Sequence, residues 1–173
     1  MTYAFTVNSN MSFTANFETI EYTPTGSDVM ARTGLPITMT TQIVNTCVTA
    51  SMEYINNNVF YGSVNQGVYL QWYLLTYKVW VIDDGVALEH IEDFINAFFW
   101  TSSFSGIQAA IDAGAVVMTD MPSSVDGSGH NIFIIGYQPN GKLIYMDPEL
   151  GYLKTASEVF FLEDYLIYIT GTK

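Results

Sequence analysis

One segment constrains the fold more than any other, because it is apolar on both faces over the length of a strand. Asn131–Tyr137 reads Asn-Ile-Phe-Ile-Ile-Gly-Tyr, with no polar residue at alternate positions. Such a run is typical of a strand that is buried on both sides. The turn Pro139-Asn140-Gly141 follows, and Lys142–Met146 returns as a second apolar run. The pattern predicts an antiparallel hairpin inside a sheet that other elements must cover.

The covering elements are expected upstream, where apolar residues recur at helical spacing. Helices are predicted over Cys47–Asn56, Asn65–Tyr77, Leu88–Trp100 and Gly106–Ala113. Asp83-Asp84-Gly85 is interpreted as a turn that caps the third helix, and Ser105 as the N-cap of the fourth. Strands are predicted over Ala115–Thr119 and Tyr165–Thr170, beside the hairpin. Helices that precede an antiparallel sheet indicate an α+β fold.

The first 35 residues differ from the rest of the chain in composition and pattern. Thr2–Val7 and Ser12–Tyr22 are rich in Phe, Tyr and Thr and are separated by an Asn-Ser-Asn turn signal. Thr23–Pro36 contains two Gly and two Pro residues and is interpreted as a loop. We expect residues 1–35 to form a β-hairpin extension and loop, and residues 36–173 to form the main domain.

Charge excludes several classes of partner. The chain of 173 residues has 5 Lys and Arg against 17 Asp and Glu, a net charge of −12. This balance argues against a nucleic-acid partner and against an anionic membrane surface, since both bind through Lys and Arg. No apolar run reaches the ~20 residues of a membrane helix, so no membrane insertion is expected.

The reactive residues are few. Cys47 is the one cysteine, which rules out an intrachain disulfide and a multi-cysteine zinc site. We expect no cofactor and no bound metal. The first ten residues have neither the basic start nor the apolar core of a secretory signal. Localisation stays open between the cytoplasm and export with a signal absent from this chain.

Three residues match a nucleophile, a base and an orienting carboxylate. Cys47 is predicted in the first turn of a helix, capped by Asn45 or Thr46, where the helix dipole favours a thiolate. His130 opens the apolar strand. If Pro139-Asn140 is a two-residue hairpin loop, Asp147 lies opposite Ile132 and shares a face with His130. Each residue also has a structural interpretation: a small core thiol, a histidine at the rim of the sheet, and an Asp-Pro turn.

Acyl transfer also requires hydrogen-bond donors for the oxyanion that develops in the transition state. The backbone N–H of Cys47 is one candidate. The side-chain amide of Gln42, in the loop before the helix, is another. Gln42 could equally be a solvated loop residue.

The sequence resembles the papain-like cysteine peptidases, in particular the bacterial branch that includes bacteriocin-leader-processing peptidases of the double-glycine type. The resemblance runs from about Pro36 to Thr170 and is most specific in residues 129–151, GHNIFIIGYQPNGKLIYMDPELG. Residues 42–51 and 107–118 resemble the nucleophile helix and the short helix and strand of that family.

The resemblance implies a papain-like fold and a peptide or protein substrate. It implies that Cys47 is the nucleophile, His130 the base, Asp147 the orienting residue and Gln42 the oxyanion donor. Gln42 precedes the cysteine by 47 − 42 = 5 residues, where the family pattern has six. Asn45 therefore remains an alternative donor.

Three functions are compatible with these residues. The first is a thiol hydrolase that cleaves a peptide or amide bond through an acyl-enzyme intermediate. The second is a transglutaminase, deamidase or cell-wall amidase with the same Cys-His-Asp order. The third is a non-enzymatic binding protein on a papain-like fold. The sequence leaves the oligomeric state open.

Outside this set of residues we expect structural roles. His90 is interpreted as a solvated surface histidine, because Glu89, Glu92 and Asp93 surround it in sequence. The three tryptophans are expected in the core; they are Trp72, Trp80 and Trp100.

Overall fold

The computed structural model describes residues 21–122, 129–158, 161 and 165–173. All but the last two residues of the expected N-terminal hairpin lie outside this part of the chain. The described helical elements are α1 (Cys47–Tyr54), η1 (Ile55–Val59), α2 (Gln66–Tyr77), α3 (Val81–Asp84), α4 (Leu88–Phe98) and α5 (Ile107–Asp112). The described strands are β1 (Val29–Met30), β2 (Phe99–Ser102), β3 (Val116–Pro122), β4 (Gly129–Tyr137), β5 (Leu143–Asp147), β6 (Tyr152–Ala156) and β7 (Ile167–Thr172).

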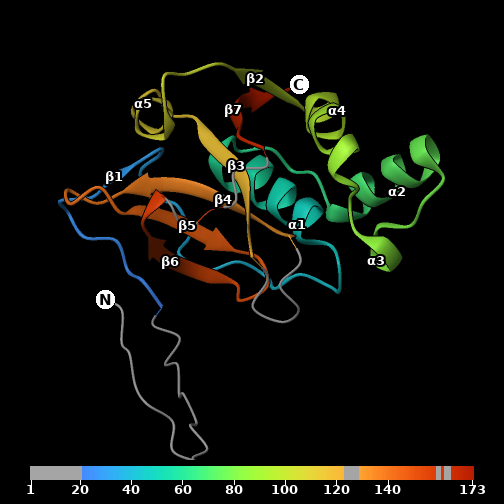
Figure 1. Ribbon diagram of the computed structural model, residues 1–173, viewed down its shortest axis with the longest axis horizontal. Helices are drawn as coiled ribbons and strands as arrows, with labels where there is room; N and C mark the ends of the chain where they lie inside the picture. Colours follow the sequence, from blue (N-terminus) through green and yellow to red (C-terminus); the bar gives the residue numbers. More distant parts are fainter. Residues whose placement is uncertain (1–20, 123–128, 159–160, 162–164) are drawn as a thin grey trace, which may run out of the picture.

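The seven described strands form one antiparallel sheet in the order β2-β7-β3-β4-β5-β6, with β1 added to β4. Figure 1 shows α2, α3 and α4 toward one end of the molecule, α1 in the middle beside the central strands, and α5 at the other end, near β1. The α+β class is confirmed, and the arrangement is compatible with a papain-like fold. Strands β2 and β6 were not expected from the sequence.

Strand β4 is the centre of the core, as its apolar sequence predicts. Every residue from His130 to Gly136 is buried. Both α1 and α5 contact this strand. The N-terminal end of α1 and the N-terminal end of β4 carry Cys47 and His130 respectively, so the packing of one helix on one strand positions two of the three residues of interest.

The segment Thr23–Pro36 is not only a loop, because β1 lies within it and pairs with the C-terminal end of β4. Strand β3 pairs with β4 only from Gly129 to Ile134, so the rest of that edge is free for β1. Gly136 permits the close approach. A Cβ atom there would lie 2.6 Å from the Met30 sulfur and 2.7 Å from the Val29 carbonyl oxygen.

Several predicted boundaries were wrong. The first helix continues past Tyr54 as the π-helix η1. Asp83 and Asp84 belong to the short helix α3 rather than to a capping turn. Ser105 does not cap α5, whose N-cap is Gly106 without a side-chain hydrogen bond. Trp100 lies in β2, because α4 ends at Phe98.

The register of the β4–β5 hairpin at the site agrees with the prediction. It results from two departures from the predicted hairpin that compensate each other. The turn contains three residues rather than two, since Gln138 N–H donates to the Lys142 carbonyl. A bulge between Ile134 and Gly136 then shifts the pairing back by one residue. Phe133 consequently faces Met146, which is the register that puts Asp147 on the same face as His130.

The predicted exposure of His90 and the predicted burial of Trp80 and Trp100 need correction. His90 is only partly exposed: its Nδ1 lies 2.9 Å from the Tyr73 hydroxyl, and its ring stacks on Tyr77 at 3.8 Å between centroids. Trp80 and Trp100 are 51% and 60% exposed rather than buried. Within the described segments, no helix combines the length and apolar character needed to cross a membrane.

Candidate active site

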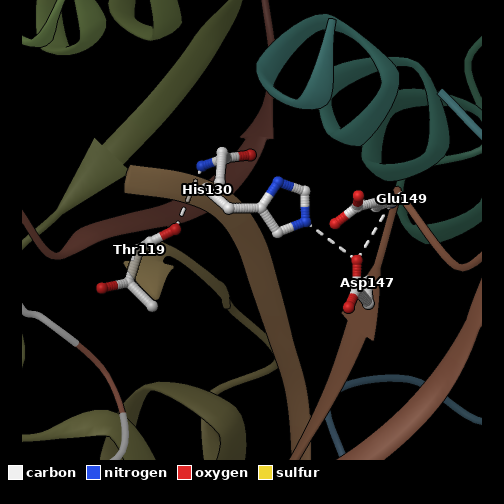
Figure 2. Close-up of polar contacts among 5 residues, drawn as sticks. Thr119, His130, Asp147 and Glu149 are labelled. Carbon is white, nitrogen blue, oxygen red and sulfur yellow. Dashed lines mark hydrogen bonds and ion pairs between the residues drawn. The ribbon is translucent and has the colours of Figure 1, made fainter. Parts of the chain in front are cut away.

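His130 and Asp147 form a buried pair at one edge of the β4–β5 hairpin. His130 Nε2 lies 2.8 Å from Asp147 Oδ1, and both side chains are almost fully buried. The same carboxylate oxygen accepts a hydrogen bond from the backbone N–H of Glu149 at 3.0 Å. Figure 2 shows the imidazole reaching from β4 to the carboxylate on β5. Two hydrogen bonds to one oxygen hold the carboxylate in place, and the carboxylate in turn orients the ring.

Cys47 contributes to the electrostatic environment of this histidine. Burial lowers the pKa of His130, but hydrogen bonds to Asp147 and Cys47, together with the charges of both groups, raise it to about 10. Since Nε2 is bonded to Asp147, Nδ1 is the ring nitrogen left for the thiol. The structure therefore brings Cys47, His130 and Asp147 together, and the two partners favour the protonated form of the imidazole.

The turn after β5 links Asp147 to the loop that precedes α1. Gly151 N–H donates to the Asp147 carbonyl at 2.7 Å, which closes the turn. Met39 N–H donates to the Gly151 carbonyl at 2.8 Å, and Gln42 N–H donates to the Pro148 carbonyl at 2.7 Å. The backbone of Gln42 is thus fixed against the turn that follows Asp147.

The side chain of Gln42 has an unusual environment. Its Oε1 atom is buried and has no hydrogen-bond partner among the described residues. A buried amide group without a partner is costly and calls for an explanation. Rotation of the amide by a half turn would exchange Oε1 and Nε2 at this position, so the buried end of Gln42 could present either an acceptor or a donor.

Asn45 has a different role from the two considered for it. Its backbone is left-handed, with φ of 62°. Its Nδ2 donates to the carbonyl oxygens of Ile82 and Asp83, both at 3.0 Å. The N-cap of α1 is Thr46, whose side chain makes no capping hydrogen bond. Asn45 therefore ties the start of α1 to α3, and both of its amide hydrogens are already used.

Glu149 is a site neighbour that the sequence did not single out. One ligand atom each from His130, Asp147 and Glu149 lie within 4.8 Å of one another. Figure 2 shows the Glu149 carboxylate beside the imidazole. A cation could be held by such a set, but the hydrogen bond between His130 and Asp147 already uses one atom of each. Glu149 follows Asp147 by two residues, in the turn after β5, and this proximity in the sequence is the signal that could have identified it.

A cavity of about 370 Å³ opens beside Cys47. The N-terminal end of α1, the α3–α4 connection, the paired ends of β3 and β4, and Tyr165 enclose it. Gly129 and Asn131 line this cavity, while His130 between them points toward Asp147. This division follows from the alternation of side chains along a strand. Asp120, directly opposite Asn131, also lines the cavity.

The sequence reasoning did not identify Asp120 or Asn131. Alternation along the strand could have identified Asn131, because the side chains directly before and after His130 point to the opposite face of the sheet. Finding Asp120 also required the β3–β4 register, which depends on a connection that the sequence does not define.

Comparison with known protein families places the chain in a family. The model of a family described as the Peptidase_C39 like family matches residues 35–169. No curated protein matches the chain.

Proposed function

Since the chain belongs to the Peptidase_C39 like family, we propose that it is a cysteine peptidase that cleaves a peptide bond with Cys47, His130 and Asp147. The observation that carries the proposal is the buried 2.8 Å contact between His130 and Asp147 on a ring whose pKa Cys47 also raises. We further propose residues 36–173 as the peptidase domain and a papain-like fold for it.

The first chemical step is acylation. The Cys47 thiolate, paired with the His130 imidazolium, attacks the carbonyl carbon of the scissile bond. The carbonyl electrons move to oxygen, which gives a tetrahedral oxyanion. As this collapses, His130 donates its proton to the leaving amine, the C–N bond breaks, and a thioester to Cys47 remains.

The second step is hydrolysis of the thioester. His130, now neutral, takes a proton from a water molecule as the oxygen attacks the thioester carbonyl. The C–S bond breaks, the carboxylic acid product leaves, and the imidazolium and thiolate are restored. Asp147 holds the ring orientation through both steps and stabilises its positive charge.

The oxyanion requires donors at the start of α1. The backbone N–H of Cys47 belongs to the first helical turn, where such groups have no intrahelical acceptor. Gln42 is the second proposed donor, because its backbone is anchored beside Asp147 and its buried amide end has no partner among the described residues. Asn45 is the less favoured donor in this proposal, since Ile82 and Asp83 accept hydrogen bonds from its amide.

The proposal is tested by incubating the protein with a peptide library that includes double-glycine leader sequences. New peptide termini, identified by mass spectrometry and absent with Cys47→Ala, are the expected result. A mass increase of about one dalton at glutamine, or incorporation of an added amine, would instead establish a deamidase or a transglutaminase. If iodoacetamide labels Cys47 completely but no peptide in the library is altered, the result would favour a non-enzymatic binding protein. Addition of a chelator should leave cleavage unchanged.

A further inference from the structure

We infer that the cavity beside Cys47 binds a positively charged group of the substrate, a lysine or arginine side chain or a free α-amino group, with Asp120 and Asn131 as its hydrogen-bond acceptors. The inference deepens the proposed function, because it names the substrate class of the same site. It rests on the orientation of Asn131, on the charge of the cavity and on its apolar wall.

The Asn131 amide has a fixed orientation. Its Nδ2 donates to the Thr119 carbonyl at 3.1 Å and to the Tyr165 hydroxyl at 2.6 Å. The Tyr165 hydroxyl is itself directed to the Thr119 carbonyl at 3.3 Å. Because a carbonyl oxygen can only accept, the amide nitrogen must face it.

This orientation leaves the oxygen of the same amide for a ligand. Asn131 is 3% exposed, and its Oδ1 atom is buried without a hydrogen-bond partner among the described residues. A buried acceptor without a partner destabilises the protein. Since Asn131 lines the cavity, a substrate N–H group that enters can remove this cost.

The negative charge of the cavity favours a substrate N–H group that is positively charged. Asp120 is 4% exposed, pairs with Asn131 across the two strands and lines the same cavity. Asp84 adds a second carboxylate from the helical side. A carboxylate accepts several hydrogen bonds at once. Asp120 can therefore keep its existing interactions and still bind a cation. None of the chain's five Lys and Arg residues is among the described residues that line the cavity.

The opposite wall suits an aliphatic stem. Apolar side chains line the cavity from α1, from the α3–α4 connection and from the start of α4; they are Val48, Val86, Leu88 and Ile91. Lysine and arginine carry a charged end on an apolar stem, and they bury the stem against such surfaces. At the acidic end, Gly129 adds no side chain of its own next to the Asp120 carboxylate, whose Oδ2 lies 3.8 Å from the position that a Cβ atom would take. The net charge of −12 also attracts cationic peptides over longer distances.

The test measures occupancy of the site by protection of Cys47, so that it does not depend on cleavage. Peptides that differ only in arginine or its neutral isostere citrulline compete with iodoacetamide for the single thiol. We expect the arginine peptide to half-protect Cys47 at a concentration on the order of ten-fold lower than the citrulline peptide, because a buried charged hydrogen bond is lost in the isostere. Acetylated and free N-termini in parallel show whether a side chain or an α-amino group is bound.

Variants locate the effect. Asp120→Asn should bring the arginine-to-citrulline ratio close to one, with protection in each variant expressed relative to its own labelling rate without peptide. Asp84 lies at the exposed rim of the cavity, so Asp84→Asn should lower the ratio less than Asp120→Asn. This variant replaces Asp120→Asn as the test if Asp120→Asn does not fold. Asp93→Asn removes the same charge from the exposed face of α4 and should leave the ratio unchanged.

The outcomes separate the two proposals. Selective protection without peptide cleavage would retain the cation pocket and reject the peptidase. Equal protection by the arginine and citrulline peptides would overturn the cation pocket, whether or not the protein cleaves peptides. Selectivity that Asp93→Asn lowers as much as Asp120→Asn would assign it to net charge and also overturn the pocket.

Discussion

His130 Nε2 and Asp147 Oδ1 lie 2.8 Å apart on adjacent strands, and the carboxylate of Asp147 is held by the backbone of the turn that follows it. A histidine bonded in this way through one ring nitrogen has its other nitrogen directed by the protein. Asp147 therefore holds the His130 ring in one orientation, and Cys47 at the start of α1 also interacts with that ring.

Asp147→Asn should reduce peptide cleavage but leave the fold intact. Asparagine still accepts a hydrogen bond from the ring, so the loss should be smaller than the ~10²–10⁴-fold that general acid–base catalysis contributes. Cys47→Ala should abolish cleavage. The comparison requires kcat/KM for both variants and circular dichroism as the folding control. An Asp147→Asn variant that unfolds, with full activity in its remaining folded fraction, would make Asp147 purely structural.

The same substitution should lower the pKa of His130 from about 10 toward its ordinary value of 6.5. The hydrogen bond and the negative charge of Asp147 raise the pKa of His130, whereas burial lowers it. The substitution removes the negative charge and weakens the hydrogen bond, so burial then has the larger influence. Nuclear magnetic resonance titration of the imidazole measures this directly. The chain has two histidines, so His90→Gln assigns the signals. An unchanged pKa would show that Asp147 does not determine the charge of the ring.

Stability should depend on pH through this pair. Folding raises the pKa of His130 from 6.5 to about 10, so folding favours its protonated form. The resulting stabilisation is fully present below about pH 6.5 and is lost as the pH rises through about 10. Urea denaturation at pH 6 should show wild type more stable than Asp147→Asn by about 1.5–3 kcal/mol. A difference that stays constant up to pH 10.5 would contradict the assignment.

The loop before α1 provides a test of the oxyanion donor. Gln42→Ala should lower turnover by ~10²–10³, the typical cost of removing one such donor, with labelling of Cys47 nearly unchanged. Asn45→Gly keeps the left-handed backbone but removes two hydrogen bonds to α3, so it should cost about 1–2 kcal/mol of stability and little turnover. The reverse ranking in turnover would assign the donor role to Asn45.

Gly151 offers a prediction about positioning without altering a reactive group. Its φ is 77°, and a Cβ atom would lie 2.8 Å from the Met39 carbonyl oxygen. Gly151→Ala should therefore displace the loop that carries Gln42 and lower both stability and turnover. Gly26→Ala is the matched control, because nothing lies within 4 Å of the added atom. Equal turnover in the two variants would show that this loop need not be held in place.

The elements that the sequence defined best are those with a local signal. The apolar run of β4 and the helical spacing of α1 and α2 depend on neighbouring residues, and the structure contains all three close to the expected bounds. Strand β1 has only two residues, and it exists because β3 leaves part of β4 without a partner. That condition arises in the folded sheet and has no signature in the local sequence.

The pairing of His130 with Asp147 was predictable only through the hairpin register. The three-residue turn and the bulge near Ile135 offset each other, so an incorrect turn still led to the correct face. Trp80 and Trp100 were misjudged because residue type alone was used, although each flanks a helix end at the surface. Asp120 and Asn131 form a pair across strands, and recognising them required the sheet itself.

Reactivity of the single thiol tests the central claim most directly. Wild-type protein and His130→Ala are treated with iodoacetamide at pH 6, and mass spectrometry follows the one cysteine. If Cys47 is paired with the His130 imidazolium, the native wild type is labelled at pH 6, at least roughly ten-fold faster than His130→Ala. A Cys47 that is unreactive in native protein and labelled only after denaturation would contradict the account and return this residue to the core.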